Sequence, residues 1–386
     1  MSQVDELFKK FNKEYKSEIF TKGIVVNNCS RIPFSSFRAE ACLYGGIPRG
    51  RIVEFSGAEG SGKTTTALDI SGNAQKLFQK EWEDEIEELS SKEKLSKEQT
   101  NRLNELRELG PKKVVWIDTE NTFDAEWAET LGVNVGQMYF MSPDSQYAEE
   151  IFDIVLELIK TGEVGLCVLD SIAMMFSKQE AEKTMEEKTY GGIAMALTRF
   201  SKFIEQACAQ TNCTFIGINQ LRDNLNAGTY GPAYNTPGGR CWKHTCSVRL
   251  MFRAGAPFDS KYVDTKKSDP NPFGHKVEIS VLKSKISKPN RKNGSYTLTY
   301  EEGINPIVDM IDIGIFIDVI HKAGAWFTFI VDKESGEVFC REDPEDGSLN
   351  EVKVQGSANL IPFLQREENK DIYELVYNRV KEYVYE

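Results

Sequence analysis

The residues from Gly57 to Thr64 have types and spacing that suit the binding of a phosphate chain. They read Gly57-Ala58-Glu59-Gly60-Ser61-Gly62-Lys63-Thr64, are followed by Thr65, and fit the pattern G-x-x-x-x-G-K-[ST]. In this pattern backbone N–H groups face phosphate oxygens, Lys63 can reach the β- and γ-phosphates, and the Thr64 hydroxyl can ligate magnesium. The pattern predicts a nucleoside triphosphate site; a glycine-rich turn without nucleotide is the alternative.

Carboxylates follow two apolar runs farther along the chain. Residues 114–117 lead to Asp118, with Glu120 two residues later, and residues 166–169 lead to Asp170. Asp170 is the expected partner of hydrated magnesium. Glu120 is the expected group that orients and deprotonates water, because no histidine stands at a suitable strand end. The alternative is that Asp118 and Glu120 only cap the helix that follows.

An amide and an irregular segment follow the next apolar run, residues 214–218. Gln220 could bond the γ-phosphate and report which nucleotide is bound; an amide that simply ends a strand is the alternative. Residues 221–239 show no periodicity, and irregular loops of that length are usually functional. Arg222 suits phosphate contact and Leu225 could wedge between bases, so the order of this loop could depend on the nucleotide.

Two other segments have the composition of contact surfaces. Within residues 182–192, Tyr190 precedes Gly191-Gly192, which suits a second binding loop; a solvated acidic turn is the alternative. Within residues 283–292 there are five positive charges, and Lys283 and Lys285 point to one face of a strand. They could meet DNA phosphates or complete a neighbouring subunit's nucleotide site, and a solvated basic edge is the alternative.

The elements that must position these residues are buried strands joined by helices. Residues 51–56 have the pattern of a strand that runs into the phosphate loop, and residues 64–80 have helical composition. Apolar strands of this kind are typical of a parallel sheet with helices on both faces, where ligands bind beyond the carboxyl ends of the strands. The sequence therefore predicts an α/β fold in which Glu120, Asp170 and Gln220 converge on the loop.

Composition narrows the class of protein. The 386 residues are 40% hydrophobic and 27% charged, which suits one large core with one or two small satellites. The formal net charge of −12 means that DNA contact would require local basic clusters. The chain has no apolar run of about 18 residues, and its eight cysteines lack Cys-x-x-Cys spacing. We expect a cytoplasmic protein with reduced thiols and no membrane contact.

Together these motifs resemble one family, the RecA-type recombinases of bacteria and their phages. The resemblance rests on residues 45–54, the phosphate loop, Ile117-Asp-Thr-Glu120, Leu169-Asp-Ser171, Ile218-Asn-Gln-Leu-Arg222, Pro237-Gly-Gly239, Lys283-Ser-Lys-Ile286 and Lys322-Ala-Gly-Ala-Trp-Phe327. It implies a RecA-like P-loop ATPase core with a twisted, mostly parallel sheet, an N-terminal arm and a small α+β C-terminal lobe.

The resemblance also implies a DNA-dependent ATPase that uses ATP and Mg²⁺. It makes Glu120 the group that activates water, Asp170 a magnesium partner and Gln220 the link between nucleotide and DNA loop. Lys283 and Lys285 would act across the subunit interface on a neighbour's ATP. By the same resemblance Asp124 and Trp127 would contact adenine, with Trp127 in place of a more usual tyrosine.

For DNA, the resemblance implies that the two loops hold a single strand. Tyr190 and Leu225 would wedge between base triplets, although Tyr190 replaces a typical methionine and the second loop is about one residue longer. The implied DNA-binding residues are Tyr190, Gly191, Gly192, Arg222, Leu225, Gly238, Gly239 and Arg240. The implied partners are single-stranded DNA, a homologous duplex, further copies in a helical filament, and single-strand-binding or loader proteins.

The predicted domains are an N-terminal oligomerisation arm (1–33), the core (34–305) and a C-terminal lobe (306–386). The arm should hold a helix over 6–16 and a strand over 23–26. Within the core, residues 81–110 carry ten acidic and five basic side chains and read as a helical hairpin broken near Ser90-Ser91 or Leu95-Ser96. The lobe should hold a helix over 309–323, a strand pair between 326 and 341, and a helix over 371–385.

Other functions use the same type of ATPase. A helicase or kinase is disfavoured by the paired lysines, by Thr236-Pro-Gly-Gly239 and by residues 322–327. A recombination mediator that binds ATP without useful hydrolysis is disfavoured by Glu120. The favoured hypothesis is a recombinase that forms filaments on single-stranded DNA and catalyses homologous pairing and strand exchange in recombination and repair.

Overall fold

The computed structural model describes residues 6–7, 9–10, 13, 29–143, 146–183, 192–223, 234–288, 290–343 and 347–385. It divides into two units, residues 1–30 and residues 31–386. In the first unit Glu6, Leu7, Lys9, Lys10 and Lys13 are helical, within the helix predicted over 6–16. The strand predicted over 23–26 lies outside the described residues.

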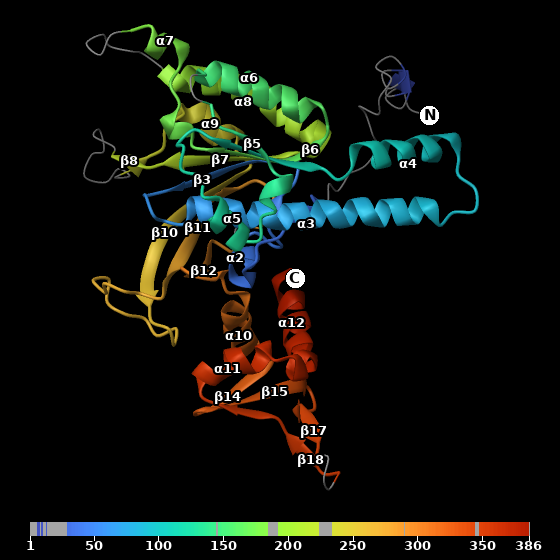
Figure 1. Ribbon diagram of the computed structural model, residues 1–386, viewed down its shortest axis with the longest axis vertical. Coiled ribbons are helices and arrows are strands. Elements are labelled where there is room, and N and C mark those ends of the chain that lie inside the picture. Colours follow the sequence, from blue (N-terminus) through green and yellow to red (C-terminus); the bar gives the residue numbers. More distant parts are fainter. Residues whose placement is uncertain are drawn as a thin grey trace. The chain divides into compact units, whose positions relative to one another are not determined.

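A nine-stranded sheet forms the centre of the second unit (Figure 1). In spatial order it comprises β13 (Gly303–Ile304), β12 (Asn293–Thr299), β11 (Gly274–Ser284), β10 (Val248–Phe258), β3 (Ile52–Gly57), β7 (Thr214–Gln220), β6 (Val164–Asp170), β4 (Lys113–Asp118) and β5 (Tyr139–Met141). From β10 to β5 every neighbouring pair is parallel, and from β10 to β13 every pair is antiparallel. The predicted α/β class with a mostly parallel sheet is confirmed.

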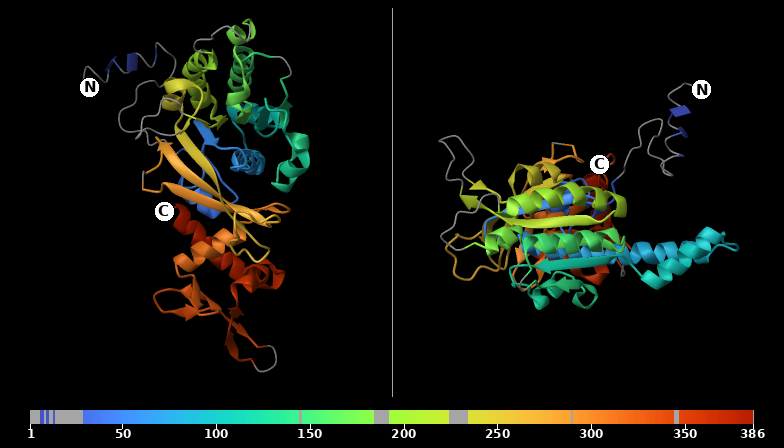
Figure 2. Two further views of the ribbon diagram at one scale, coloured as in Figure 1. Left: turned by 90° about the vertical axis from the view of Figure 1, so that its left-hand side faces the viewer. Right: turned by 90° about the horizontal axis from the view of Figure 1, so that it is seen from above.

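Helices cover both faces of the sheet, so its central strands are buried on each side (Figure 2). The helices of one layer are α3 (Lys63–Ser90) and α5 (Ala125–Thr130), and those of the other are α6 (Ala148–Lys160), α8 (Gly192–Thr211) and α9 (Gly239–Thr245). Along β4, Val114 and Trp116 enter the first layer while Val115 and Ile117 enter the second. This period of two is the reason the strands read as continuous apolar runs.

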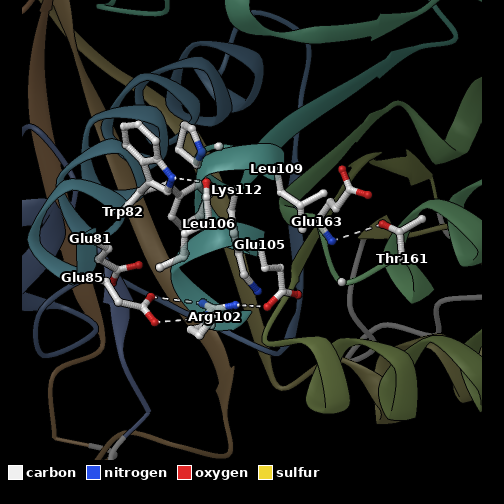
Figure 3. Close-up of a pocket in the computed structure, with 14 residues that line it drawn as sticks. Glu81, Trp82, Glu85, Arg102, Glu105, Leu106, Leu109, Lys112, Thr161 and Glu163 are labelled. Carbon is white, nitrogen blue, oxygen red and sulfur yellow. Dashed lines mark hydrogen bonds and ion pairs between the residues drawn. The ribbon is translucent and has the colours of Figure 1, made fainter. Parts of the chain in front are cut away.

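The predicted helical hairpin is present, and its first arm is the phosphate-loop helix itself. Helix α3 continues without a break to Ser90, and α4 (Lys97–Leu109) returns from a capping box made by Ser96 and Gln99. Leu89, Leu103 and Leu106 form a small buried cluster between the two arms. The hairpin extends beyond the edge of the sheet (Figure 2). Between its base and residues 161–163 lies a hollow of 240 Å³ (Figure 3).

The C-terminal lobe has a hydrophobic cluster of its own, to which Phe37 of the short helix α2 (Phe37–Ala41) also contributes. Its elements are α10 (Pro306–Phe316), β14 (Ile320–Ala323), β15 (Trp326–Asp332), β16 (Glu337–Val338), β17 (Cys340–Glu342), β18 (Leu349–Glu351), β19 (Lys353–Gln355), α11 (Ser357–Gln365) and α12 (Lys370–Tyr385). The helix predicted over 371–385 is confirmed by α12. The predicted strand pair corresponds to β15 and β16, but β15 also pairs with β14 and β19.

The helix predicted over 309–323 is wrong in its second half. Helix α10 begins at Pro306, after the N-cap Asn305, and ends at Phe316. Asp318 then adopts the left-handed conformation (φ 61°), and the chain reverses into β14. Ile320 is fully buried because it packs as a strand residue in the lobe, which overrides the helical spacing of the apolar side chains.

Candidate nucleotide site

Four strand ends meet at one edge of the sheet, which we call the carboxyl edge: the ends of β3, β7, β6 and β4 with the residues that directly follow them. The register places Gly57 at the end of β3 opposite Gln220, and Asp118 at the end of β4 opposite Asp170. Parallel strands bring their carboxyl ends to the same side, so residues far apart in the sequence converge here. The predicted convergence of the phosphate loop with Asp170 and Gln220 is present.

The phosphate loop is held in shape by close packing around two glycines. Gly62 has φ 90° and is the N-cap of α3, and a Cβ there would lie 2.9 Å from Val277. A Cβ on Gly57 would lie 2.6 Å from the carbonyl oxygen of Phe252. Neither position has room for a side chain, and Gly62 also needs a backbone conformation that other residues rarely adopt. The loop therefore presents the first N–H groups of α3 at the carboxyl edge.

The donors at this loop suit a triphosphate with a divalent cation. Lys63 donates to the carbonyl oxygen of Ala58 at 2.7 Å, and the Thr64 hydroxyl donates to Asp170 Oδ2 at 2.7 Å. The Ser61 hydroxyl is buried and has no hydrogen-bond partner among the described residues. Unpaired donors at a helix N-terminus fit phosphate, and the oxygens of Thr64 and Asp170 are ligands of the kind Mg²⁺ takes.

Burial sets the electrostatics of this site. It raises the pKa of Asp170 to about 6, against the lowering effect of the hydrogen bond from Thr64. It also lowers the pKa of Lys63, although the carboxylates of Asp170 and Glu120 oppose that change. Both shifts come mainly from the loss of water around a charge. A cation beside Asp170 and phosphates beside Lys63 would each offset that loss.

Glu120 is fixed by two donors, one at the end of β7 and one directly after β6. Gln220 Nε2, at the end of β7, donates to Glu120 Oε1 at 2.8 Å, and the hydroxyl of Ser171 donates to the same oxygen. The hydroxyl of Thr119 both accepts from the Ser171 N–H and donates to the Ser171 carbonyl, each at 2.8 Å. Within the described residues, Glu120 Oε2 accepts no hydrogen bond. The carboxylate is thus oriented through one oxygen and open at the other.

Asp118 has a structural role that differs from a helix cap. Its carboxylate accepts from the backbone N–H groups of Glu120, Thr122 and Phe123 at 2.9–3.0 Å and so orders the loop that carries Glu120. The helix that follows, α5, is capped by Asp124, which accepts from the Trp127 N–H at 3.0 Å. Asp124 is exposed and Trp127 packs partly against the core. Their predicted contact with adenine stays a prediction.

The segment after Gln220 is more regular at its base than predicted. Strand β8 (Arg222–Asp223) pairs antiparallel with β9 (Tyr234–Asn235), so this loop leaves and returns as a narrow ribbon. Arg222 donates to the Ala173 carbonyl at 3.2 Å. Gly238 is the N-cap of α9, followed by Gly239 and an exposed Arg240. Gly192 is the first residue of α8, whereas Tyr190, Gly191 and Leu225 lie outside the described residues.

Lys283 and Lys285 lie away from the phosphate loop of their own chain. Lys283 on β11 pairs with Arg249 of β10, which pairs with Glu54, three residues before Gly57. Its ammonium donates to the carbonyls of Lys243 and His244 at 2.7 and 2.8 Å. Lys285 lies 4.0 Å from Glu205 on α8. No hydrogen bond or ion pair within the described part of the chain joins either lysine to residues 57–64.

A buried network behind the site was missed in the sequence. Glu54 is fully buried on β3 and accepts from Asn219 Nδ2 at 3.0 Å, from Trp242 Nε1 at 2.9 Å and from Arg249 Nε. Asn219 also donates to the Pro237 carbonyl at 3.0 Å. The network thus joins the strand that ends in Gln220 to the far end of the loop. The available signal was an acidic residue inside the apolar run 52–55.

Comparison with known proteins identifies a family for this chain. The family model for the RecA N-terminal domain matches residues 3–81 and 90–305. The chain belongs to the RecA family. The interruption of the match, residues 82–89, lies in the arm of the hairpin that α3 contributes.

Curated relatives agree with this assignment to the RecA family. Protein RecA of Campylobacter jejuni subsp. doylei is 30% identical over 321 residues, 82% of this chain and 81% of that protein. Protein RecA of Streptomyces coelicolor is 30% identical over 349 residues, 87% and 81% of the two chains. Protein RecA of Fusobacterium nucleatum subsp. nucleatum is 29% identical over 350 residues, 90% and 77%. Separately, none of the helices described has the length and apolarity needed to cross a membrane.

Proposed function

We propose that this RecA-family protein is an ATP-dependent DNA recombinase, which forms filaments on single-stranded DNA and catalyses homologous pairing and strand exchange. The observation that carries the proposal is the contact between Gln220 and Glu120. It joins the group placed to activate water to the strand that continues directly into the candidate DNA loop. Hydrolysis and DNA contact are then properties of one connected unit.

In this proposal the chain's own residues divide the work of ATP hydrolysis. The loop N–H groups and Lys63 bind the phosphates, and Thr64 with Asp170 would hold Mg²⁺, which would neutralise charge on the phosphates when bound. Glu120 Oε1 is held by Gln220 and Ser171, so Oε2 is directed to orient a water and take its proton. Asp124 and Trp127 would contact the adenine.

Gln220 is the proposed link between nucleotide and DNA. Its amide nitrogen carries two N–H groups and donates one to Glu120 here, so a γ-phosphate could accept the other or replace Glu120 as the acceptor. A change of partner would move the end of β7 and with it the β8–β9 ribbon. Arg222, Gly238, Gly239 and Arg240 at the ribbon and its exit would contact DNA, together with Tyr190, Gly191, Gly192 and Leu225.

The paired lysines support a role between subunits. Lys283, near the end of β11, and Lys285, just after it, lie toward the amino end of β3, because β11 runs antiparallel to β10. Both are therefore distant from the phosphate loop at the other end of β3. We propose that they reach the ATP of a neighbouring copy in the filament, where positive charge would stabilise the transferring phosphoryl group. Residues 1–33 would dock on that neighbour.

Electron microscopy combined with a pairing assay tests this proposal. With ATP, Mg²⁺ and single-stranded DNA, helical filaments should form, and adding a homologous duplex should yield joint molecules. A heterologous duplex is the control and should yield none, because base pairing supplies the specificity. Closed rings that unwind the duplex would indicate a helicase instead. Joint molecules formed equally well by Glu120→Gln and Lys63→Ala would indicate a mediator that needs no ATP chemistry.

A further inference from the structure

Behind the phosphate loop, two adjacent strands form a wall against Gly62. Val277 on β11 and Tyr296 on β12 are direct cross-strand partners. A Cβ at Gly62 would lie 2.9 Å from Val277 and 3.1 Å from the Tyr296 hydroxyl. Tyr296 is 1% exposed, so its hydroxyl must find partners inside the protein. Those partners belong to the loop and to the first turn of α3.

The partners of Tyr296 are the Thr66 hydroxyl and the Gly62 carbonyl. Thr66 Oγ1 donates to the Gly62 carbonyl at 2.7 Å, and the Tyr296 hydroxyl lies 2.8 Å from Thr66 Oγ1 and 3.3 Å from that carbonyl oxygen. When the Thr66 hydroxyl donates to the Gly62 carbonyl, the Tyr296 hydroxyl donates to Thr66 Oγ1, the nearer of its two partners. We call this chain of hydrogen bonds, from Tyr296 through Thr66 to the Gly62 carbonyl, the relay.

The relay acts with a backbone hydrogen bond of α3, from the Thr66 N–H to the Gly62 carbonyl, in holding a peptide group at the proposed phosphate site. In a planar trans peptide the carbonyl of one residue and the N–H of the next point in opposite directions. Holding the Gly62 carbonyl toward Tyr296 therefore turns the Lys63 N–H away from the wall, toward the space at the α3 N-terminus. Gly62 has φ 90°, a backbone conformation that glycine adopts readily because it lacks a Cβ. The same freedom means that the glycine backbone by itself restrains the peptide group least. The Gly62 carbonyl accepts the first backbone hydrogen bond of α3, from the Thr66 N–H at 2.9 Å, and the two hydroxyls add a second hold at the same oxygen.

We propose that Tyr296 is a positioning residue for nucleotide binding, acting through Thr66 on the Gly62–Lys63 peptide group. The inference deepens the proposed function and rests on ATP as the ligand. It assigns to β12, a strand outside the parallel part of the sheet, an indirect part in phosphate recognition. The side chain touches neither the nucleotide nor the water and would change how tightly phosphate is held.

Tyr296→Phe tests this role, because it removes the hydroxyl and keeps the ring. The dissociation constant for an ATP analogue with a fluorescent N-methylanthraniloyl ribose should rise about 10-fold, the effect of weakening one hydrogen bond to a charged group. KM for ATP should rise with it, while kcat changes by less than about twofold, as expected for an interaction equal in ground and transition states. Tyr262→Phe, which removes a hydroxyl that accepts from Asn305, is the matched control and should bind ATP normally.

Double variants separate positioning from simple destabilisation. Thr66→Val should raise the dissociation constant as Tyr296→Phe does, and the double variant should be no worse than either single one, because both break the same relay. Thr66→Ser retains the hydroxyl and should restore binding. A lower Tm with unchanged nucleotide affinity in Tyr296→Phe would overturn the inference. If the wild-type protein itself bound no ATP analogue, the proposed function would fail instead.

Discussion

The acids of the carboxyl edge and those of the helical hairpin differ in what surrounds them. At the edge Glu120 and Asp170 accept hydrogen bonds from side chains on neighbouring elements, and Asp118 accepts them from the backbone of the loop that follows it. In the hairpin, residues 81–110, the acids are mostly exposed, and some form surface ion pairs such as those of Arg102 with Glu85 and Glu105. Acidic side chains are therefore held in fixed orientations at the carboxyl edge and are exposed to solvent in the hairpin. Their position in the fold, more than their residue type, decides which of them could take part in a reaction.

Figure 3 shows the hairpin side of that comparison. Arg102 lies between Glu85 and Glu105 at one side of the hollow, while the Trp82 indole donates to the Leu106 carbonyl at 2.7 Å. The ion pairs neutralise one another at the surface, where each contributes little to stability. The indole contact and the leucine cluster hold the arms together. The described contacts between the two arms thus lie within the hairpin, although its first arm continues the phosphate-loop helix.

The largest effects should follow changes at the carboxyl edge. Lys63→Ala and Glu120→Gln should each reduce kcat/KM for ATP by at least about 100-fold, since one removes the proposed phosphate contact and the other the proposed base. Lys80→Ala, on the same helix, and Glu129→Gln, on α5, are exposed controls and should be near wild type. Steady-state phosphate release measures the effect. Comparable losses in both controls would mean that these residues are not special.

Next in size is the loss of the buried acid behind the site. Glu54→Ala should lower the free energy of unfolding by about 3–5 kcal/mol, because it leaves the partly buried Arg249 guanidinium without its counter-ion and the buried Trp242 indole N–H without its acceptor. Glu87→Ala in the hairpin is the exposed counterpart and should change it by less than about 0.5 kcal/mol. Urea unfolding of both variants makes the comparison. Similar decreases in the free energy of unfolding for Glu54→Ala and Glu87→Ala would contradict the difference between the buried acids near the site and the exposed acids of the hairpin.

A third prediction concerns pH. Burial raises the pKa of Asp309 from 3.8 to about 7, against the lowering effects of the hydrogen bond from Ser36 and the charge of Arg38; Asp312 adds to the rise. The folded state then holds a proton that the unfolded chain releases earlier, so stability is full below about pH 4 and falls toward pH 7. Asp309→Asn should flatten that fall in urea midpoints measured from pH 4.5 to 7.5.

In Asp309→Asn the urea midpoint should still fall as the pH rises, but less steeply than in the wild-type protein. Burial also raises the pKa of Glu40 to about 7 and that of Asp69 to about 6, and both remain in Asp309→Asn. The control is Asp84→Asn, an exposed carboxyl in the hairpin for which the slope should be unchanged. Equal slopes in wild type and Asp309→Asn would contradict a protonated, buried carboxyl at this position.

The smallest effect should come from removal of the hairpin. Replacing residues 82–109 by a short glycine-serine linker keeps Glu81, which pairs with Arg49, and should leave ATP turnover within about twofold of wild type. Loop replacements of this kind alter the closure entropy only slightly. Phosphate release with and without the hairpin is the measurement. A loss as large as that of Glu120→Gln would show that the two regions are coupled after all.

The sequence was most informative about residues at the ends of buried strands. The runs 114–117, 166–169 and 214–218 predicted β4, β6 and β7, and parallel strands necessarily bring their ends together. It was least informative where long-range packing decided the outcome. Ile320 joins a strand because the lobe buries it there, and the partners of Glu54 come from three separate elements. Tyr296 was not singled out in the sequence, because its place against Gly62 comes from the pairing of β12 with β11.

Steady-state ATP turnover with and without single-stranded DNA tests the central claim most directly. If Gln220 links Glu120 to the DNA loop, turnover by the wild-type protein should rise several-fold when single-stranded DNA is added. In Gln220→Ala the basal rate should fall and the response to DNA should be lost. Turnover that is the same with and without DNA in the wild-type protein would contradict the account.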